Sequence, residues 1–240
     1  MEKSKQEEKD VKEVVVEKKY NQKAIWSLVL GIALIFILLN TSNNVKKFAN
    51  TYAIFQDKNE DVLTASKIPV ASLTEDDYWV NFENATGNFE QSASQKIKDS
   101  HRAQDLYDSD IQFFLKLYSE AIDNLDIMVV LLTENAGALK NKEQKLIALE
   151  ITQDASNISK YHKHLFINYL ETFDIQEKVL QSIIDNNGDL NKAYYSDGIQ
   201  TVIRDLSQLN SERGLIQESL EELNNKITDK YALLKGSVDL

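Results

Sequence analysis

The chain has 240 residues, enough for one domain of ordinary size with an additional tail or anchor. It contains one proline and seven glycines, too few for the tight turns of a β-sandwich or barrel, so the composition predicts a mostly helical protein. The absence of cysteine excludes a disulfide framework, a thiolate zinc site, an iron–sulfur cluster and a cysteine nucleophile. A net charge of -11 argues against a protein that binds nucleic acid through its phosphate backbone.

An uncharged and largely apolar segment, residues 24–45, is predicted to be a single transmembrane helix. At about 1.5 Å per residue it reaches roughly 33 Å, which matches a hydrocarbon core of about 30 Å. The alternative is a cleaved secretory signal. It is disfavoured because the charged region in front is long, the apolar core exceeds the usual length of about 7–15 residues, and no small-x-small cleavage pattern follows.

Residues 1–23 are predicted to form a charged cytoplasmic tail. They carry seven lysines, whereas the other side of the apolar segment offers Lys46, Lys47 and then Lys58. Because lysine-rich flanks stay in the cytoplasm, this excess predicts a cell-membrane protein with a cytoplasmic N-terminus and an extracytoplasmic C-terminal domain. Because this tail is too polar to bury a hydrophobic core, it is interpreted as a signal that sets membrane topology. The alternative is that it contacts lipid headgroups or a partner.

The region beyond the anchor is predicted to divide into a stalk and linker, residues 46–73, and a helical bundle domain, residues 74–240. Ser72 and Glu75 have the spacing of a capping box that begins the first helix of the bundle. An apolar face with steps of three and four then continues from Trp79 to Ile97. The polar stretch 98–110 is interpreted either as a turn or as a solvated part of a longer helix.

Three longer helices are expected after this stretch. The first ends near Gly137 and is so apolar that burial on more than one side is expected. The second runs from about Leu139 to Asp185. The sequence Asn186-Asn187-Gly188-Asp189 predicts the loop that follows it.

The third of these helices carries the clearest heptad pattern in the chain, which we call the heptad seam. It predicts coiled-coil-like packing, either within the protein's own bundle or with another copy. Arg213 and Lys230 interrupt the pattern, and their charged ends are expected to reach water. The eight apolar positions of the heptad seam are Val202, Leu206, Leu209, Ile216, Leu220, Leu223, Ile227 and Leu234.

The predicted fold class is therefore all-α, with a single N-terminal transmembrane helix followed by an elongated antiparallel bundle of three or four helices. No constellation of catalytic residues is visible: the Glu-x-x-His pattern of di-iron bundles, phosphate loops and calcium loops are all missing. His162 lies on an apolar stripe and is interpreted as a hydrogen-bonded core histidine, which would be pH-sensitive if it titrated. We therefore expect no enzyme activity, no cofactor and no metal.

The leading functional hypothesis is a non-enzymatic interaction or scaffold module at the cell envelope. Its expected partners are the membrane, through residues 24–45, and either another copy of the chain or an envelope protein, with no nucleic acid. The alternative is an extracytoplasmic sensory or ligand-binding helical bundle. Aromatic residues such as Phe113 and Tyr169 could line a ligand cavity in that case, although core packing is their usual role.

Overall fold

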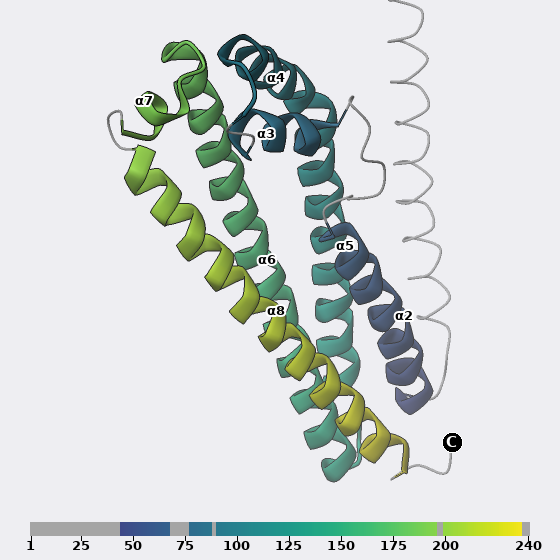
Figure 1. Cartoon of the computed structure of the whole chain (residues 1–240). Helices are drawn as coiled ribbons and strands as arrows, with labels where there is room; N and C mark the ends of the chain where they lie inside the picture. The colour runs from purple at the N-terminus through teal and green to yellow at the C-terminus, as the bar shows by residue number, and fades with distance from the viewer. Residues whose placement is uncertain (1–43, 68–76, 88–89, 196–198, 237–240) are drawn as a thin grey trace, which may run out of the picture. The chain divides into compact units, whose positions relative to one another are not determined.

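The computed structural model describes residues 44–67, 77–87, 90–195 and 199–236, and all ordered elements within these ranges are helical (Figure 1). This confirms the predicted all-α fold class. The elements are α2 (Asn44–Ala65), α3 (Tyr78–Gly87), α4 (Ala93–Leu106), the π-helical turn η1 (Tyr107–Ile111), α5 (Gln112–Gly137), α6 (Lys142–Asp185), α7 (Leu190–Tyr195) and α8 (Ile199–Gly236).

The predicted tail and nearly all of the predicted transmembrane segment lie outside the described residues. Only Asn44 and Val45 of that segment are described, and they begin α2. Within the part of the chain that the structure describes, no helix combines the length and the apolarity needed to cross a membrane.

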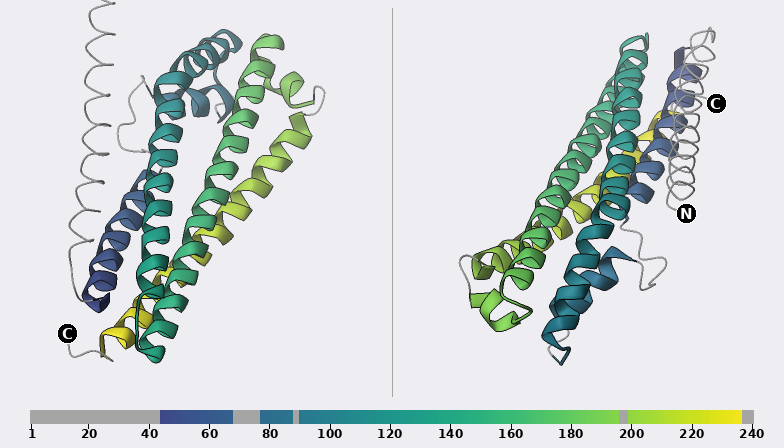
Figure 2. Two further views of the ribbon diagram at one scale, coloured as in Figure 1. Left: turned by 180° about the vertical axis from the view of Figure 1, so that it is seen from behind. Right: turned by 90° about the horizontal axis from the view of Figure 1, so that it is seen from above.

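Internal contacts divide the chain into residues 1–51 and residues 52–240, and the second unit holds the features described below. In this unit α5 packs against α6, and α6 packs against α8, as two views show (Figures 1 and 2). Phe114 lies against Phe173 while Tyr118 lies against His162, so α5 and α6 are antiparallel. The short helices α3, α4 and α7 gather at the end of the unit where α6 ends.

The ends of α5 and α6 have local causes that the sequence signals. α5 ends at Gly137, as predicted, and Asn141 caps α6 because its Oδ1 accepts hydrogen bonds from the amides of Glu143 (2.9 Å) and Gln144 (3.2 Å). α6 ends at Asp185, again as predicted.

The loop after α6 requires its glycine for two reasons. Asn187 and Gly188 have φ angles of 52° and 76°, in the left-handed region that side chains with a Cβ rarely adopt. A Cβ at Gly188 would also lie 2.3 Å from the carbonyl oxygen of Ala93. The predicted loop thus holds the end of α6 tightly against the start of α4.

The apolar face expected from Trp79 to Ile97 is divided between two helices, which corrects the prediction of one continuous face. α3 ends at Gly87, and Ser92 begins α4 by accepting a hydrogen bond from the Gln95 amide on its side chain. The fully buried aromatic side chain of α3 is Tyr78 rather than Trp79. Ser72 and Glu75 lie outside the described residues.

The polar stretch 98–110 is helical throughout, which supports the longer-helix alternative. α4 continues through the π-helical turn η1 directly into α5. The turn also supports the start of α3, because Asp110 Oδ2 accepts a hydrogen bond of 3.0 Å from the Tyr78 amide and so satisfies a donor that the first turn of a helix leaves free.

α5 is less deeply buried than its composition suggested. One face is in the core, with Tyr118, Leu125 and Leu132 fully buried. The expectation of burial on more than one side is corrected, because four large apolar side chains of α5 are between 42% and 57% exposed, namely Phe113, Leu117, Ile127 and Val130.

Candidate functional site

The heptad seam of α8 faces α6 of the same chain. Both helices are long, and they make the most extensive helix–helix contact in the residues the structure describes. Because α6 covers the heptad seam, the first of the two packing alternatives is realised within the chain. Leu209, Leu220, Ile227 and Leu234 are buried, while Val202, Leu206, Ile216 and Leu223 are half-buried.

Lys230 pairs with carboxylates of α6, which the sequence did not predict. Its Nζ lies 2.7 Å from Asp154 Oδ2 and 3.3 Å from Glu150 Oε2. Burial by itself would lower the pKa of the Lys230 ammonium, but the hydrogen bonds and negative charges of Asp154 and Glu150 raise it overall. Asp154 is 4% exposed, and a second cation, Lys226, approaches it at 3.9 Å. This polar layer is therefore charge-compensated.

Arg213 also turns toward α6, but it meets neutral groups. Its Nε donates to Asn168 Oδ1 at 3.1 Å, and its Nη2 donates to Thr172 Oγ1 at 2.7 Å. The guanidinium carbon lies 4.4 Å from the ring centroid of Tyr169, a cation–π contact. Burial lowers the pKa of the guanidinium, and the nearby Tyr169 acts in the opposite direction. Among the described residues, no carboxylate lies within ion-pair distance of Arg213.

These two layers set the alignment of α8 on α6. Lys230 meets Asp154 near the start of α6, whereas Arg213 meets Asn168 further along it, so the two helices are antiparallel. Asn168 also donates to the backbone oxygen of Leu209 at 2.8 Å. Polar contacts at fixed positions along the two helices favour one register of α8 on α6. A shift of α8 along α6 would leave buried polar groups without partners.

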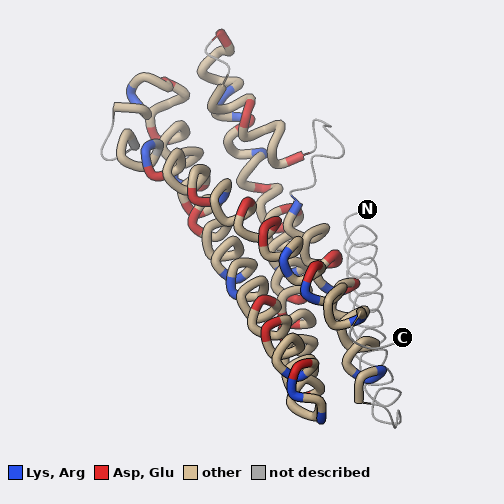
Figure 3. Tube along the Cα trace, turned by 90° about the horizontal axis from the view of Figure 1, so that it is seen from below, with Lys and Arg blue, Asp and Glu red and all other residues tan. Residues whose placement is uncertain are grey.

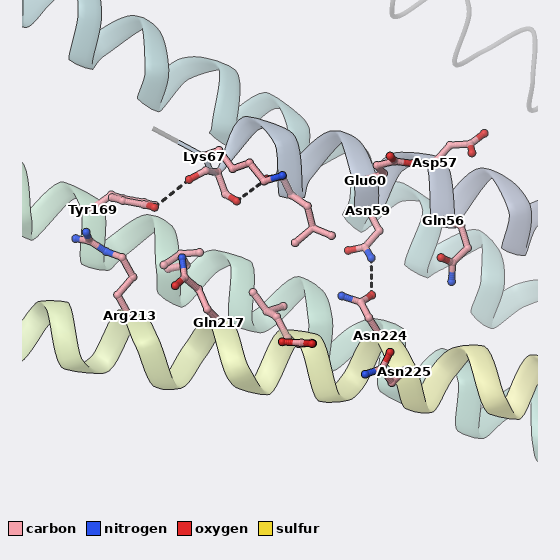
Figure 4. A pocket seen from close by; sticks show the side chains of 15 residues that line it. Gln56, Asp57, Asn59, Glu60, Lys67, Tyr169, Arg213, Gln217, Asn224 and Asn225 are labelled. Atoms are coloured by element: carbon pink, nitrogen blue, oxygen red, sulfur yellow. Dashed lines mark hydrogen bonds between the residues drawn. The ribbon is translucent and has the colours of Figure 1, made fainter. Parts of the chain in front are cut away.

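A pocket of about 820 Å³ lies between α2, α6 and α8, next to the Arg213 layer (Figure 4). The helix of the predicted stalk therefore helps to form a cavity, since from Tyr52 onward it packs on α8. The rings of Tyr52 and Tyr231 stack at 3.9 Å, and Asn59 Nδ2 donates to Asn224 Oδ1 at 2.6 Å. The hydroxyl of Tyr169 donates to the Ser66 carbonyl at 2.9 Å and so fixes the end of α2 to α6.

The two ends of this pocket differ in charge. Arg213 and Tyr169 lie at one end, and the Asn59–Asn224 amide pair lies toward the other (Figure 4). The exposed Lys67 lies near Tyr169 (Figure 4), and three exposed carboxylates, from Asp57, Glu60 and Glu221, line the pocket as well. Leu63, Leu165 and Leu220 supply its apolar wall. A charged ligand could therefore be recognised here in one orientation.

His162 lies in the core between α5 and α6, as the sequence predicted. It is fully buried, and the Tyr118 hydroxyl oxygen lies 3.2 Å from both its Nδ1 and its backbone oxygen. Its Nε2 has no hydrogen-bond partner. Burial lowers the pKa of His162 to about 4, so the imidazole is neutral at pH 7.

The remaining polar surface offers little other chemistry. The described residues contain no group of three histidine or acidic side chains placed to hold a metal ion. A smaller groove of about 460 Å³ lies between α6 and α8 and is lined by polar side chains such as Tyr161, His164 and Glu222. Acidic and basic residues are interleaved along the long helices rather than gathered by sign (Figure 3).

Comparison with known proteins gives a partial likeness. The chain is 33% identical over 67 residues to the chromosome partition protein Smc of Aquifex aeolicus. The match covers 28% of this chain and 6% of the length of that protein. No protein-family model and no solved structure matches the chain. The likeness agrees with a helical, coiled-coil-like protein and extends no further.

The sequence pattern identified the heptad seam but missed what α6 and α2 bring to it. Asp154, Asn168 and Thr172 are buried polar residues of α6 that meet the two cations of α8. A signal was present, because polar residues on the α6 stripe are unusual and often pair with each other. Nothing in the sequence indicated that α2 would pack beside them.

Proposed function

We propose that the chain is a membrane-anchored, non-enzymatic interaction module whose helical bundle binds a protein partner at the cell envelope. Residues 24–45 are the anchor, and the lysine-rich flank 1–23 keeps the N-terminus in the cytoplasm. The bundle then faces the outside. The coiled-coil-like character of the chain and its partial likeness to Smc support a role in protein–protein contacts.

The observation that carries this proposal is a set of four exposed large apolar side chains on the outer face of α5, in two pairs that Glu120, Asp123 and Asn124 separate. The heptad seam is occupied within the chain, so it is not the surface offered to a partner. Phe113, Leu117, Ile127 and Val130 remain 42–57% exposed on one helix, although the same helix has a fully buried face of its own. Within each pair the side chains lie one helical turn apart, and neighbouring large apolar side chains on a surface favour a protein contact over solvent.

Crosslinking in intact cells tests the proposal, because the chain has no cysteine to interfere. A thiol-reactive photocrosslinker is attached to Ile127→Cys or Leu117→Cys on the outer face of α5, and to Asp229→Cys on the exposed side of α8 as the control. We expect one adduct of defined mass from both α5 positions and none from position 229. An adduct of two chains identifies a homo-oligomer, and another mass identifies an envelope partner.

A second variant makes the result decisive. Ile127→Glu, read out through a crosslinker at Leu117→Cys, should abolish the adduct if the apolar face makes the contact. Equal labelling from α5 and α8, or an adduct that survives Ile127→Glu, contradicts the proposal.

The second candidate is a ligand-binding or sensory bundle. It is favoured by the pocket between α2, α6 and α8, whose volume of about 820 Å³ lies within the range of small-molecule sites. The two functions are compatible, because the pocket lies between α2, α6 and α8, whereas the exposed apolar side chains proposed to bind a partner lie on α5.

A further inference from the structure

The Arg213 guanidinium borders the pocket with donor capacity to spare. It carries five N–H groups, and its described contacts use one on Nε and one on Nη2. Its partners are neutral, so its positive charge is uncompensated at close range, unlike that of Lys230. Both hydrogen bonds lie on the Nε–Nη2 edge and go to α6, so the Nη1 end is left to accept a carboxylate in a bidentate arrangement typical of arginine.

The rest of the pocket disfavours a ligand that is only negative. Asp57, Glu60 and Glu221 line the same cavity, and they repel an additional phosphate or polyanion. Glu221 follows Arg213 by eight residues on α8, which places their backbones about 12 Å apart along the helix. Lys67 also lines the pocket, beside Tyr169 (Figure 4), so two cations lie toward the Arg213 end, and the length of a small molecule separates Arg213 from Glu221.

Away from Arg213 the pocket offers hydrogen-bonding groups and an apolar wall. Asn59 is 3% exposed, and its Oδ1 has no hydrogen-bond partner, while its Nδ2 bonds to Asn224. Gln217 adds a second side-chain amide, and Leu220 and Leu165 supply apolar surface. Side-chain amides suit a ligand that carries peptide groups, since they can both donate to and accept from a backbone.

We propose that this pocket binds a short zwitterionic peptide, with its terminal carboxylate on Arg213 and its terminal ammonium toward the carboxylates of α2 and α8. Three extended residues span about 10 Å, which suits the separation between the two charged ends. The inference rests on the second candidate function, a ligand-binding bundle, and names its ligand class; it does not depend on the exposed apolar side chains of α5.

The test is calorimetric titration of the full chain, purified in detergent, with three probes. These are trialanine, trialanine with an amidated C-terminus, and trialanine with an acetylated N-terminus. We expect trialanine to bind. We expect amidation to weaken binding by about tenfold or more, because it removes the charge that pairs with Arg213, and acetylation to weaken it by a smaller factor.

A matched pair of variants assigns the effect to the residue. Arg213→Gln should abolish the difference between trialanine and its amide, while Arg204→Gln, at a solvent-exposed arginine of the same helix, should leave it unchanged. Circular dichroism melting confirms that both variants fold. The probe comparison uses the unaltered chain, so it stands even if Arg213→Gln is unstable.

The proposal is overturned if trialanine produces no binding heat at millimolar concentration, or if the amide binds as well as the free acid. It is also overturned if inorganic phosphate binds and trialanine does not compete with it, which would identify a simple anion site. None of these results affects the crosslinking test of the α5 surface, so the two proposals fail separately.

Discussion

Lys230 and Arg213 are the two charged residues that interrupt the heptad seam of α8, and α6 gives them different surroundings. Lys230 meets Asp154 and Glu150, with Lys226 close by. Arg213 meets an amide, a hydroxyl and an aromatic ring. One layer is a closed set of charges, whereas the other leaves a positive charge beside an open pocket.

The difference separates a structural role from a functional one. A buried carboxylate that is compensated by a lysine fixes register, but the pair does not attract a further ion. An arginine whose local partners are neutral gains from an added carboxylate, and a cavity gives that carboxylate a place to bind. The comparison therefore predicts that the Lys230 layer matters more to stability and the Arg213 layer more to binding.

The largest expected effect on stability comes from placing a charged residue in the apolar part of the heptad seam, between Arg213 and Lys230. Leu220 is 2% exposed, so Leu220→Asp buries a carboxylate without a partner and should lower the free energy of unfolding by about 4 kcal/mol or more. The measurement is chemical denaturation followed by circular dichroism.

The control is the same substitution on the outer side of α8. Leu215 is 64% exposed, and Leu215→Asp should change the free energy of unfolding by less than about 0.5 kcal/mol. Similar effects at both positions would show that α8 does not pack through the heptad seam.

The next largest effect is expected from acidification, which acts on His162 at the contact between α6 and α5. The pKa of His162 is about 4 in the folded chain, below its ordinary value of 6.5. The unfolded chain therefore binds more protons between these values, and stability should fall as the pH falls from about 6.5 to 4, by roughly 3 kcal/mol.

His162→Leu isolates this contribution, because the carboxylates titrate in both proteins and cancel in the difference. The variant should lose the part of the pH dependence that lies between pH 6.5 and 4. Identical pH profiles for the two proteins would contradict burial of a neutral imidazole between α5 and α6.

Lys230→Met should have the third largest effect. It leaves Asp154 buried with only Lys226 at 3.9 Å, and the expected loss is about 2 kcal/mol of unfolding free energy. A double variant, Asp154→Leu with Lys230→Met, should recover much of that loss because no buried charge remains without a partner. The absence of any recovery would mean that the pair is not coupled.

Arg213→Met should have the smallest effect on stability, about 1 kcal/mol. It removes two hydrogen bonds but leaves no unpaired charge, and the methionine side chain can still pack on Tyr169. A loss greater than that of Lys230→Met in the same denaturation experiment would reverse the comparison between the two layers.

Local signals in the sequence predicted much of the fold. Gly137, Asn187 and Gly188 marked the ends of α5 and α6, and the heptad pattern located α8, because helix caps and periodicity act over a few residues. The division at Gly87 and Ser92 was missed, since the apolar spacing continues across a break that only the new N-cap reveals.

The candidate pocket was not predictable, because it depends on how separate helices pack. The sequence suggested that Arg213 and Lys230 would both extend to water, and a heptad pattern does not contain the polar residues of the facing helix. Asn168 and Asp154 of α6 give Arg213 and Lys230 their different surroundings, and both are distant in sequence from the α8 residues that they contact. The contribution of α2 is more distant still, since Asn59 reaches Asn224 from the predicted stalk.

The central claim is that the heptad seam closes within one chain, and paired cysteines test it most directly. Asn157 of α6 and Glu222 of α8 line the same small groove, so both are changed to cysteine in the otherwise cysteine-free full chain and treated with a short bismaleimide. We expect a crosslinked monomer that forms at any protein concentration, with no product from either single variant. Crosslinked dimers that increase with concentration, without the internally linked monomer, would contradict the claim.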